Sequence, residues 1–317
     1  MKKVKLSVSE LKAYYFTTKG IIKAVDDINF EIYNGESLGI AGESACGKSS
    51  LGAALLRILQ PPGMIAGGSI KLNDEDIIQL PDSHFDKKIR WKKISMVFQG
   101  AMNTLDPVYT IGDQMKEIME QHQFKGDFDS IISESLKQVG LDKSIVERYP
   151  HQLSGGMKQR VVIAMALLLD PEVVIADEPT TALDVLVQAQ IMSLLRRLKN
   201  EKGMTVILIT HDLAIISEIA DKIAIMYAGQ IVEFGASSDI YKNAKHPYTQ
   251  ALLLAIPKLH SSDKQMHFVK GSPPNLLNLT SGCRFYSRCP HAMEICKKDP
   301  PEIKTENNGY VRCWLYK

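Results

Sequence analysis

The sequence predicts an α/β fold built on a mostly parallel sheet with helices on its faces. Two observations indicate it: a phosphate-binding motif stands between a predicted strand and a predicted helix, and helix and strand patterns alternate from residue 161 to about 245. The composition agrees, because 45% hydrophobic and 23% charged residues in a chain of 317 are typical of a globular protein. This length allows about two domains.

The first sixty residues give three strands and a helix. Lys5 to Val8 and Asp27 to Ile32 alternate apolar with polar residues, and Ser37 to Ala41 is a compact apolar strand. A helix is predicted over Ser49 to Leu59, because apolar residues recur at helical spacing until Pro61.

The later elements follow the same rules. Ile94 to Phe98 is predicted as a buried strand, and the segments near 112–122 and 129–140 have amphipathic helical patterns. The strands predicted in the alternating part are Val173–Ala176, Thr205–Ile209 and Ile223–Met226.

The chain has no predicted membrane span or signal peptide. Its longest apolar run, Val161 to Leu169, is nine residues, about half of the length that crosses a bilayer. The basic N-terminus leads into no apolar segment, so we expect the chain to remain in the cytosol. A net charge of +2 argues against a dominant nucleic-acid surface.

The phosphate motif is the run Gly42-Glu43-Ser44-Ala45-Cys46-Gly47-Lys48-Ser49, which fits G-x-x-x-x-G-K-[ST]. Its glycines let backbone N–H groups converge on phosphate oxygens at a helix N-terminus. Lys48 is expected to reach the β- and γ-phosphates and the Ser49 hydroxyl to bind Mg²⁺. A chance match is on the order of 1%, so the motif predicts a nucleotide site.

An acidic pair supplies the second half of such a site. Asp177 and Glu178 follow the apolar strand at 173–176, at the strand end where open parallel sheets bind ligands. Asp177 suits the water shell of the metal, and Glu178 suits a base that orients or deprotonates the attacking water.

Three further elements belong to the same prediction. Ser154, Gly155 and Gly156 start a helix and form a second anion-binding terminus, which two chains packed head to tail could use on one triphosphate. Gln99 and His211 each end a predicted strand, where a polar group would face the same crevice.

With these residues in this order, residues 4 to 245 resemble the ATP-hydrolysing subunit of an ABC transporter. The resemblance implies an ABC-type P-loop NTPase core with a RecA-like fold, a helical subdomain, and a composite site in which Ser154 and Gly156 act on the ATP of a partner cassette. It also implies that His211 contacts the γ-phosphate and Gln99 the metal and water. Tyr15 would stack on adenine, with Tyr14 as the competing candidate.

The sites implied by this resemblance are of three kinds. Catalytic roles fall to Glu178, His211 and Gln99, and Mg²⁺ ligands are Ser49, Gln99 and Asp177. ATP binding involves Tyr15, Gly42, Ser44, Cys46, Gly47, Lys48, Ser49, Ser50, Gln99 and Asp177, together with Ser154, Gly155 and Gly156 of the partner.

A closer resemblance is to the ATPase subunits of dipeptide and oligopeptide importers. Three stretches carry it, and they also occur in related nickel importers: Tyr149–Gln152, Leu105–Gln114 and His246–Leu252. Two positions depart from the usual pattern, since Ala45-Cys46 replaces Gly-Ser and Met157 replaces Gln. Backbone N–H groups bind the phosphates, so neither departure removes a ligand.

The resemblance also implies an organisation and partners. Residues 1–100 and 161–245 would form the ATPase core, 101–160 the helical subdomain and 246–317 a small irregular Cys-rich C-terminal domain. The subunit would lie on the cytoplasmic face of the membrane with a second ATPase subunit, as a heterodimer or a homodimer. Its other partners would be two permease subunits and, indirectly, an extracytoplasmic peptide-binding protein.

Four of the five cysteines lie in the last 35 residues, namely Cys283, Cys289, Cys296 and Cys313. In a reducing compartment such a group favours a metal site over disulfides, and four thiolates can hold Zn²⁺ or an iron–sulfur cluster. The wide spacings favour the larger cluster. The importer branch has a [4Fe-4S] cluster in some members, so the resemblance implies that cofactor, with Zn²⁺ as the first alternative and free thiols as the second. A structural role is favoured over a regulatory one.

Two other functions stay open at this point. One is an importer of nickel or another small solute, since substrate choice lies in other subunits. The other is a soluble ABC ATPase acting on ribosomes or DNA, favoured only by the tail 246–317, which has ten basic and five acidic residues. The single cassette and the absence of sustained heptads argue against this second function.

Overall fold

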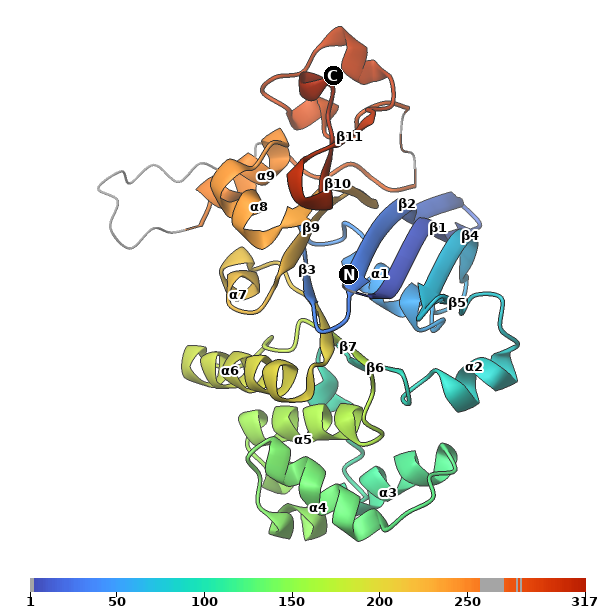
Figure 1. The fold of residues 1–317 in the computed structure, drawn as a ribbon, viewed down its shortest axis with the longest axis vertical. Coiled ribbons are helices and arrows are strands. Elements are labelled where there is room, and N and C mark those ends of the chain that lie inside the picture. Colours follow the sequence, from blue (N-terminus) through green and yellow to red (C-terminus); the bar gives the residue numbers. More distant parts are fainter. Residues whose placement is uncertain (1–2, 257–270, 278, 280) are drawn as a thin grey trace. The chain divides into compact units, whose positions relative to one another are not determined.

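The computed structural model describes residues 3–256, 271–277, 279 and 281–317, which fall into two compact units. The helical unit comprises residues 33–35 and 79–208, and the phosphate-loop unit comprises 3–32, 36–78 and the described residues from 209 to 317. Figure 1 shows the elements of both units. Residues 257–270 of the predicted C-terminal domain lie outside the described residues.

The phosphate-loop unit contains an antiparallel sheet in the order β2-β1-β4-β5. Its strands are β1 (Val4–Thr17), β2 (Gly20–Tyr33), β4 (Gly63–Leu72) and β5 (Glu75–Asp76). The first two are each 14 residues long, far longer than the segments predicted from alternation. Glu10 interrupts the alternation, because it adopts a left-handed φ of 50° where the register between β1 and β4 shifts.

A second set of strands in this unit has the order β11-β12-β10-β9-β3. β3 (Ser37–Ala41) and β9 (Lys222–Tyr227) are parallel and fully buried, as predicted. β10 (Gln230–Ala236), β11 (Glu302–Lys304) and β12 (Tyr310–Arg312) add antiparallel pairs that the sequence patterns did not reveal. The C-terminal segment thus contributes two strands to the sheet edge rather than forming only irregular loops.

Among the described residues of the phosphate-loop unit, the α-helices are α1 (Lys48–Leu55), α7 (Leu213–Ser217), α8 (Ser237–Asn243) and α9 (Pro247–Leu254). α1 ends four residues before the predicted Leu59, because Arg57 takes a left-handed φ of 54°. The core of the phosphate-loop unit includes the fully buried side chains of Leu38, Ile40, Leu51 and Leu55.

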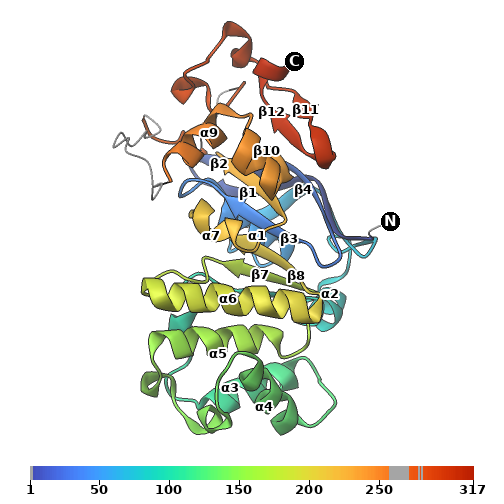
Figure 2. The ribbon, with the colours of Figure 1, turned by 60° about the vertical axis from the view of Figure 1, so that its left-hand side comes forward.

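The helical unit holds three strands in the order β8-β7-β6, with β6 and β7 parallel. They are β6 (Ile94–Val97), β7 (Val173–Asp177) and β8 (Thr205–Ile209), all buried as predicted. Its helices are α2 (Asp82–Lys88), α3 (Ile111–Gln121), α4 (Phe128–Gln138), α5 (Gly155–Leu167) and α6 (Val185–Lys202). Figure 2 shows α5 and α6 side by side.

Side-chain caps fix the N-termini of several helices in the helical unit. Thr110 and Asp113 form a capping box at α3, and Asp127 and Asp184 cap α4 and α6. No helix in the described ranges is both long and apolar enough to cross a membrane. The predicted division at residues 100, 160 and 245 stays a prediction.

Candidate functional site: the nucleotide machinery in two units

The phosphate loop occupies the turn between β3 and α1, the place that the motif predicts. Its end glycines are fixed by sterics. A Cβ on Gly42 (φ 154°) would lie 2.2 Å from the Met226 carbonyl oxygen, and one on Gly47 (φ 104°) would lie 1.9 Å from that of Ala24. Only glycine therefore fits these two corners.

Lys48 is buried and its ammonium group lies inside the loop. Its Nζ donates to the carbonyl oxygens of Gly42 at 2.7 Å and Glu43 at 2.9 Å. Burial raises the pKa of the neighbouring Cys46 thiol, although the charge of Lys48 opposes the shift. Cys46 is thus a neutral, buried filler of the loop.

Ala45 takes a left-handed φ of 61°. A residue other than glycine costs about 1 kcal/mol in this region. The departure from the usual Gly-Ser pair therefore affects loop strain and not the number of phosphate ligands.

The two candidate adenine-stacking tyrosines have different partners. The Tyr14 hydroxyl donates to the Asp26 carboxylate, and burial together with this bond raises the pKa of Tyr14. The Tyr15 hydroxyl lies 3.2 Å from Oγ of Ser50, which follows the phosphate loop directly. The structure thus brings together two predicted nucleotide residues, Tyr15 and Ser50, and assigns Tyr14 to a buried polar group.

His211 follows β8 and is exposed in the phosphate-loop unit. The next residue, Asp212, caps α7 through the Ala214 N–H at 2.8 Å. Ser44 and Ser49 are also exposed, as residues that bind a ligand must be.

The acidic pair and Gln99 lie in the helical unit. Asp177 is buried at the end of β7, and Glu178 follows in a left-handed conformation with φ 45°. Gln99 Nε2 donates to Glu178 Oε2 at 3.0 Å, and Thr181 Oγ1 donates to the same oxygen at 2.9 Å. The predicted base is therefore held by two donors.

Ser154, Gly155 and Gly156 lie at the start of α5 in the same unit. Ser154 caps the helix by accepting the Met157 N–H at 3.3 Å. A Cβ on Gly156 would lie 2.9 Å from Cγ1 of Val187, whereas one on Gly155 would meet nothing closer than 3.6 Å. Gly156 thus has a packing role against α6 in addition to its predicted role, and Gly155 has none.

The four tail cysteines are all free. The backbone N–H of Cys283 donates to the carbonyl of Cys296 at 2.8 Å. Burial, and then the charges of the other three cysteines, raise the pKa of Cys283 to about 11. Within the described ranges, no group of three or more His, Cys, Asp or Glu side chains is arranged to hold a metal ion.

Three arginines of the tail bind the rest of the phosphate-loop unit, which the sequence patterns did not reveal. Arg284 pairs with Asp26, Arg312 with Asp27, and Arg288 with Glu43 of the phosphate loop. Burial alone would raise the pKa of Asp26, but its bonds to Tyr14 and Arg284 hold it below the usual value.

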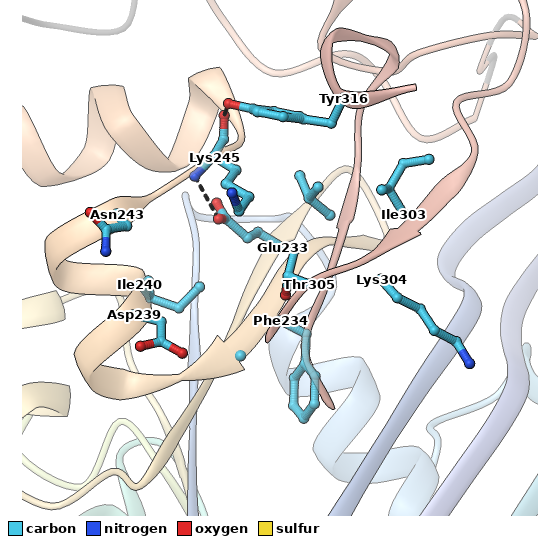
Figure 3. A pocket seen from close by; sticks show the side chains of 12 residues that line it. Glu233, Phe234, Asp239, Ile240, Asn243, Lys245, Ile303, Lys304, Thr305 and Tyr316 are labelled. Carbon is cyan, nitrogen blue, oxygen red and sulfur yellow. Dashed lines mark hydrogen bonds between the residues drawn. The ribbon is translucent and has the colours of Figure 1, made fainter. Parts of the chain in front are cut away.

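The same unit has a cavity of about 760 Å³ beside β10 and β11, shown in Figure 3. Glu233 lies in it and accepts the Lys245 N–H at 2.7 Å, while the Tyr316 hydroxyl donates to the Lys245 carbonyl at 2.7 Å. None of the residues that line this cavity belongs to the predicted sites.

Comparisons with known families agree with this arrangement. Residues 25–181 match the family described as ABC transporter, and residues 232–296 match the family described as oligopeptide/dipeptide transporter, C-terminal region. The second match spans the end of the ATPase core and three of the four tail cysteines.

Two curated relatives match nearly the whole chain. The dipeptide transport ATP-binding protein DppD of Caldanaerobacter subterraneus subsp. tengcongensis is 42% identical, over 98% of this chain and 97% of its own. The oligopeptide transport ATP-binding protein OppD of Escherichia coli (strain K12) is 46% identical, over 93% of this chain and 88% of its own.

A solved structure titled as the dimeric structure of MJ0796, a bacterial ABC transporter cassette, is 29% identical. It has a TM-score of 0.64, and the match covers 73% of this chain and 98% of that one. The structure of cbiO1 from Clostridium perfringens, part of the ABC transporter complex cbiONQ, is 28% identical with a TM-score of 0.65. That match covers 76% of this chain and 92% of the other. The chain therefore belongs to the ABC transporter ATPases, in the group of dipeptide and oligopeptide transport ATP-binding proteins.

Proposed function

We propose that this chain powers the import of dipeptides or oligopeptides by hydrolysing ATP. The observation that carries the proposal is similarity over nearly the full chain to ATP-binding proteins named for dipeptide and oligopeptide transport. The match of residues 232–296 to the C-terminal region of such transporters supports the peptide branch in particular.

The phosphate loop is proposed to bind the triphosphate of ATP. Its N–H groups and the Lys48 ammonium offer positive charge at the start of α1, where phosphate oxygens bind. Tyr15, held beside Ser50, offers a ring for adenine. Mg²⁺, when bound, neutralises phosphate charge. A hydroxyl from Ser49, an amide oxygen from Gln99 and a carboxylate from Asp177 are the oxygen donors that Mg²⁺ prefers.

Glu178 is proposed to orient and deprotonate the attacking water. Gln99 and Thr181 both donate hydrogen bonds to Oε2 of Glu178, and these bonds fix the orientation of its carboxylate. A carboxylate held in this way can accept a proton from water. His211 is proposed to contact the γ-phosphate.

The exposed N-terminus of α5 is proposed to complete the ATP site of a second cassette. Ser154 is exposed and caps this helix. Because helix N-termini bind anions, the γ-phosphate of a partner's ATP is a suitable ligand. The second cassette is proposed to be a related but different ATPase subunit, and the membrane partners to be two permease subunits. The chain would then lie on the cytoplasmic face of the membrane, with a peptide-binding protein acting outside.

Transport assays in a strain that lacks this gene test the proposal. Complementation with the wild-type chain is expected to restore uptake of labelled dipeptides or oligopeptides, and the Glu178→Gln variant is expected not to. Nickel uptake is measured in the same strains. Restored nickel uptake without peptide uptake would contradict the peptide proposal in favour of the small-solute importer, and recovery of the chain with ribosomes or DNA but not membranes would contradict transport.

A [4Fe-4S] cluster on Cys283, Cys289, Cys296 and Cys313 is a separate proposal, with Zn²⁺ as the alternative. The charges of Cys289, Cys296 and Cys313 contribute to the raised pKa of Cys283, which indicates that the four side chains lie near one another and supports the proposal. Their side chains do not form a ligand set in the structure, so no step of the ATPase reaction is assigned to the cluster. Iron, sulfide and zinc content of protein purified without oxygen tests it. About four irons per chain would support the cluster, and one zinc would support the alternative. Protein that contains neither metal would contradict both proposals.

A further inference from the structure

The tail reaches the phosphate loop through one arginine. Arg288 Nη1 lies 2.6 Å from Oε2 of Glu43, and Nη2 lies 2.8 Å from Oε1. This is a bidentate pair, the geometry in which a guanidinium fixes the orientation as well as the position of a carboxylate. The Arg288 side chain is only 3% exposed and that of Glu43 is 26% exposed, so solvent screens the pair less than it screens a surface ion pair.

Glu43 is held at its backbone as well as at its side chain. Its N–H donates to the Tyr248 hydroxyl at 2.9 Å, and its carbonyl accepts from Lys48 at 2.9 Å. The first turn of the loop is therefore fixed between the tail, helix α9 and the phosphate-binding lysine.

The arginine is itself held by aromatic rings. Its guanidinium lies 5.6 Å from the ring centre of Tyr227 and 5.9 Å from that of Phe285, and it donates to the Tyr227 hydroxyl at 3.2 Å. Tyr227, Tyr248 and Phe285 pack on one another with ring centres 4.7 to 5.4 Å apart. Because these rings are buried, little freedom remains for Arg288 to leave Glu43.

We propose that Arg288 is a positioning residue for the nucleotide site, through which the Cys-rich tail keeps the phosphate loop in the shape that binds ATP. Arg288 touches no nucleotide atom in this proposal, since it acts through Glu43. The inference rests on the proposed role of Gly42–Ser49 as the phosphate loop. Arg288 directly precedes Cys289, so the arginine that holds the loop is adjacent to one of the four tail cysteines.

The test compares ATP affinity with turnover in the full-length chain. Arg288→Gln and Glu43→Gln are each expected to raise the Kd for a fluorescent ATP analogue and the KM for ATP by about tenfold, with kcat within about twofold of wild type, because a buried bidentate pair is lost while Glu178 is untouched. Arg288→Lys is expected to recover only part of the affinity. The double variant is expected to resemble the single ones, since both remove the same interaction.

Arg312→Gln is the matched control. Arg312 is a buried arginine of the same tail, with 8% of its side chain exposed, and its ion pairs are to Asp27 and Glu302 outside the loop. We expect it to lower the unfolding temperature without changing the KM. Equal effects of Arg288→Gln and Arg312→Gln on the KM, or an unchanged KM in Glu43→Gln, would overturn the positioning role. Lys48→Ala distinguishes a failure of the positioning role from a failure of the phosphate-loop assignment. Intact ATP affinity in that variant would contradict the phosphate-loop assignment itself.

Discussion

Gln99 and Glu178, which follow neighbouring parallel strands β6 and β7, are joined by a hydrogen bond of 3.0 Å between Nε2 and Oε2. A carboxylate fixed by an amide keeps a constant direction without losing its charge, as a base for water requires. The amide oxygen of Gln99 is the atom that we propose as a ligand of Mg²⁺.

Glu178→Gln is therefore expected to lower ATP hydrolysis by at least about a hundredfold, since the substitution removes the proposed base while keeping the shape of the side chain. ATP binding and ATP-dependent dimer formation should persist. Phosphate release measures the hydrolysis rate, and size-exclusion chromatography with ATP measures dimer formation. Glu201→Gln, at an exposed position of α6, is the control and should hydrolyse normally. Wild-type turnover in Glu178→Gln would exclude this residue as the base.

Lys48→Ala is expected to weaken ATP binding by at least about tenfold, because it removes the buried ammonium that is proposed to bind the phosphate oxygens. Isothermal titration with ATP and Mg²⁺ measures the change. The exposed Lys87→Ala on α2 supplies the comparison and should bind as the wild type does.

Ser154→Ala tests the proposed role of the N-terminus of α5 in binding a partner's ATP. Loss of a cap costs about 1 kcal/mol of stability whether or not the residue binds nucleotide. Thr110→Ala removes the equivalent cap from α3 and should cost a similar amount. We expect hydrolysis at saturating ATP to fall only in Ser154→Ala. A similar fall in both variants would make Ser154 a structural cap and no more.

Gly155→Ala and Gly156→Ala form a second matched pair. Gly156→Ala is expected to destabilise the helical unit by about 1–3 kcal/mol, because its methyl group would press on Val187. Gly155→Ala should leave the melting temperature almost unchanged, so any loss of activity there would report on the partner's ATP. A stable Gly156→Ala variant would contradict the packing role.

His246 gives a pH prediction. It is 1% exposed and accepts the Tyr248 N–H at 3.1 Å, and burial lowers its pKa to about 3. The unfolded chain binds a proton near pH 6.5 and the folded chain does not, so stability is present above that pH and falls as the pH drops toward 3. By pH 5.5 this group alone removes about 1.4 kcal/mol.

His246→Asn keeps an N-cap for α9 but cannot titrate. The wild type should lose more stability than this variant between pH 8 and 5.5, which denaturant midpoints at the two pH values compare. The neighbouring Glu233, whose pKa is raised by burial, is present in both chains and cancels in the difference. Equal losses would show that His246 is not the titrating group.

The sequence was sufficient to place the nucleotide residues on their elements. The strands before Gly42 and Asp177 are continuous apolar runs, and motifs with fixed spacing mark the turns that follow them. Such local signals do not depend on distant parts of the chain, which is why they were read correctly.

The long strand β2 was only partly predicted, for a physical reason. Asp26 and Asp27 interrupt its apolar pattern, and their partners Arg284 and Arg312 come from the far end of the chain. A charge in a strand looks like a break until its partner is known. The pairing of Arg288 with Glu43 was missed for the same reason, since no periodicity links residues 245 positions apart.

Synthesis of the chain is directional, and the bond between Arg288 and Glu43 spans almost its whole length. The ribosome makes the phosphate loop among the first fifty residues and its arginine within the last thirty. A nascent or prematurely terminated chain therefore has the loop without its support. Under the proposed role of Arg288, chains that stop before this residue are expected to bind ATP weakly and to compete poorly for nucleotide with chains that contain it.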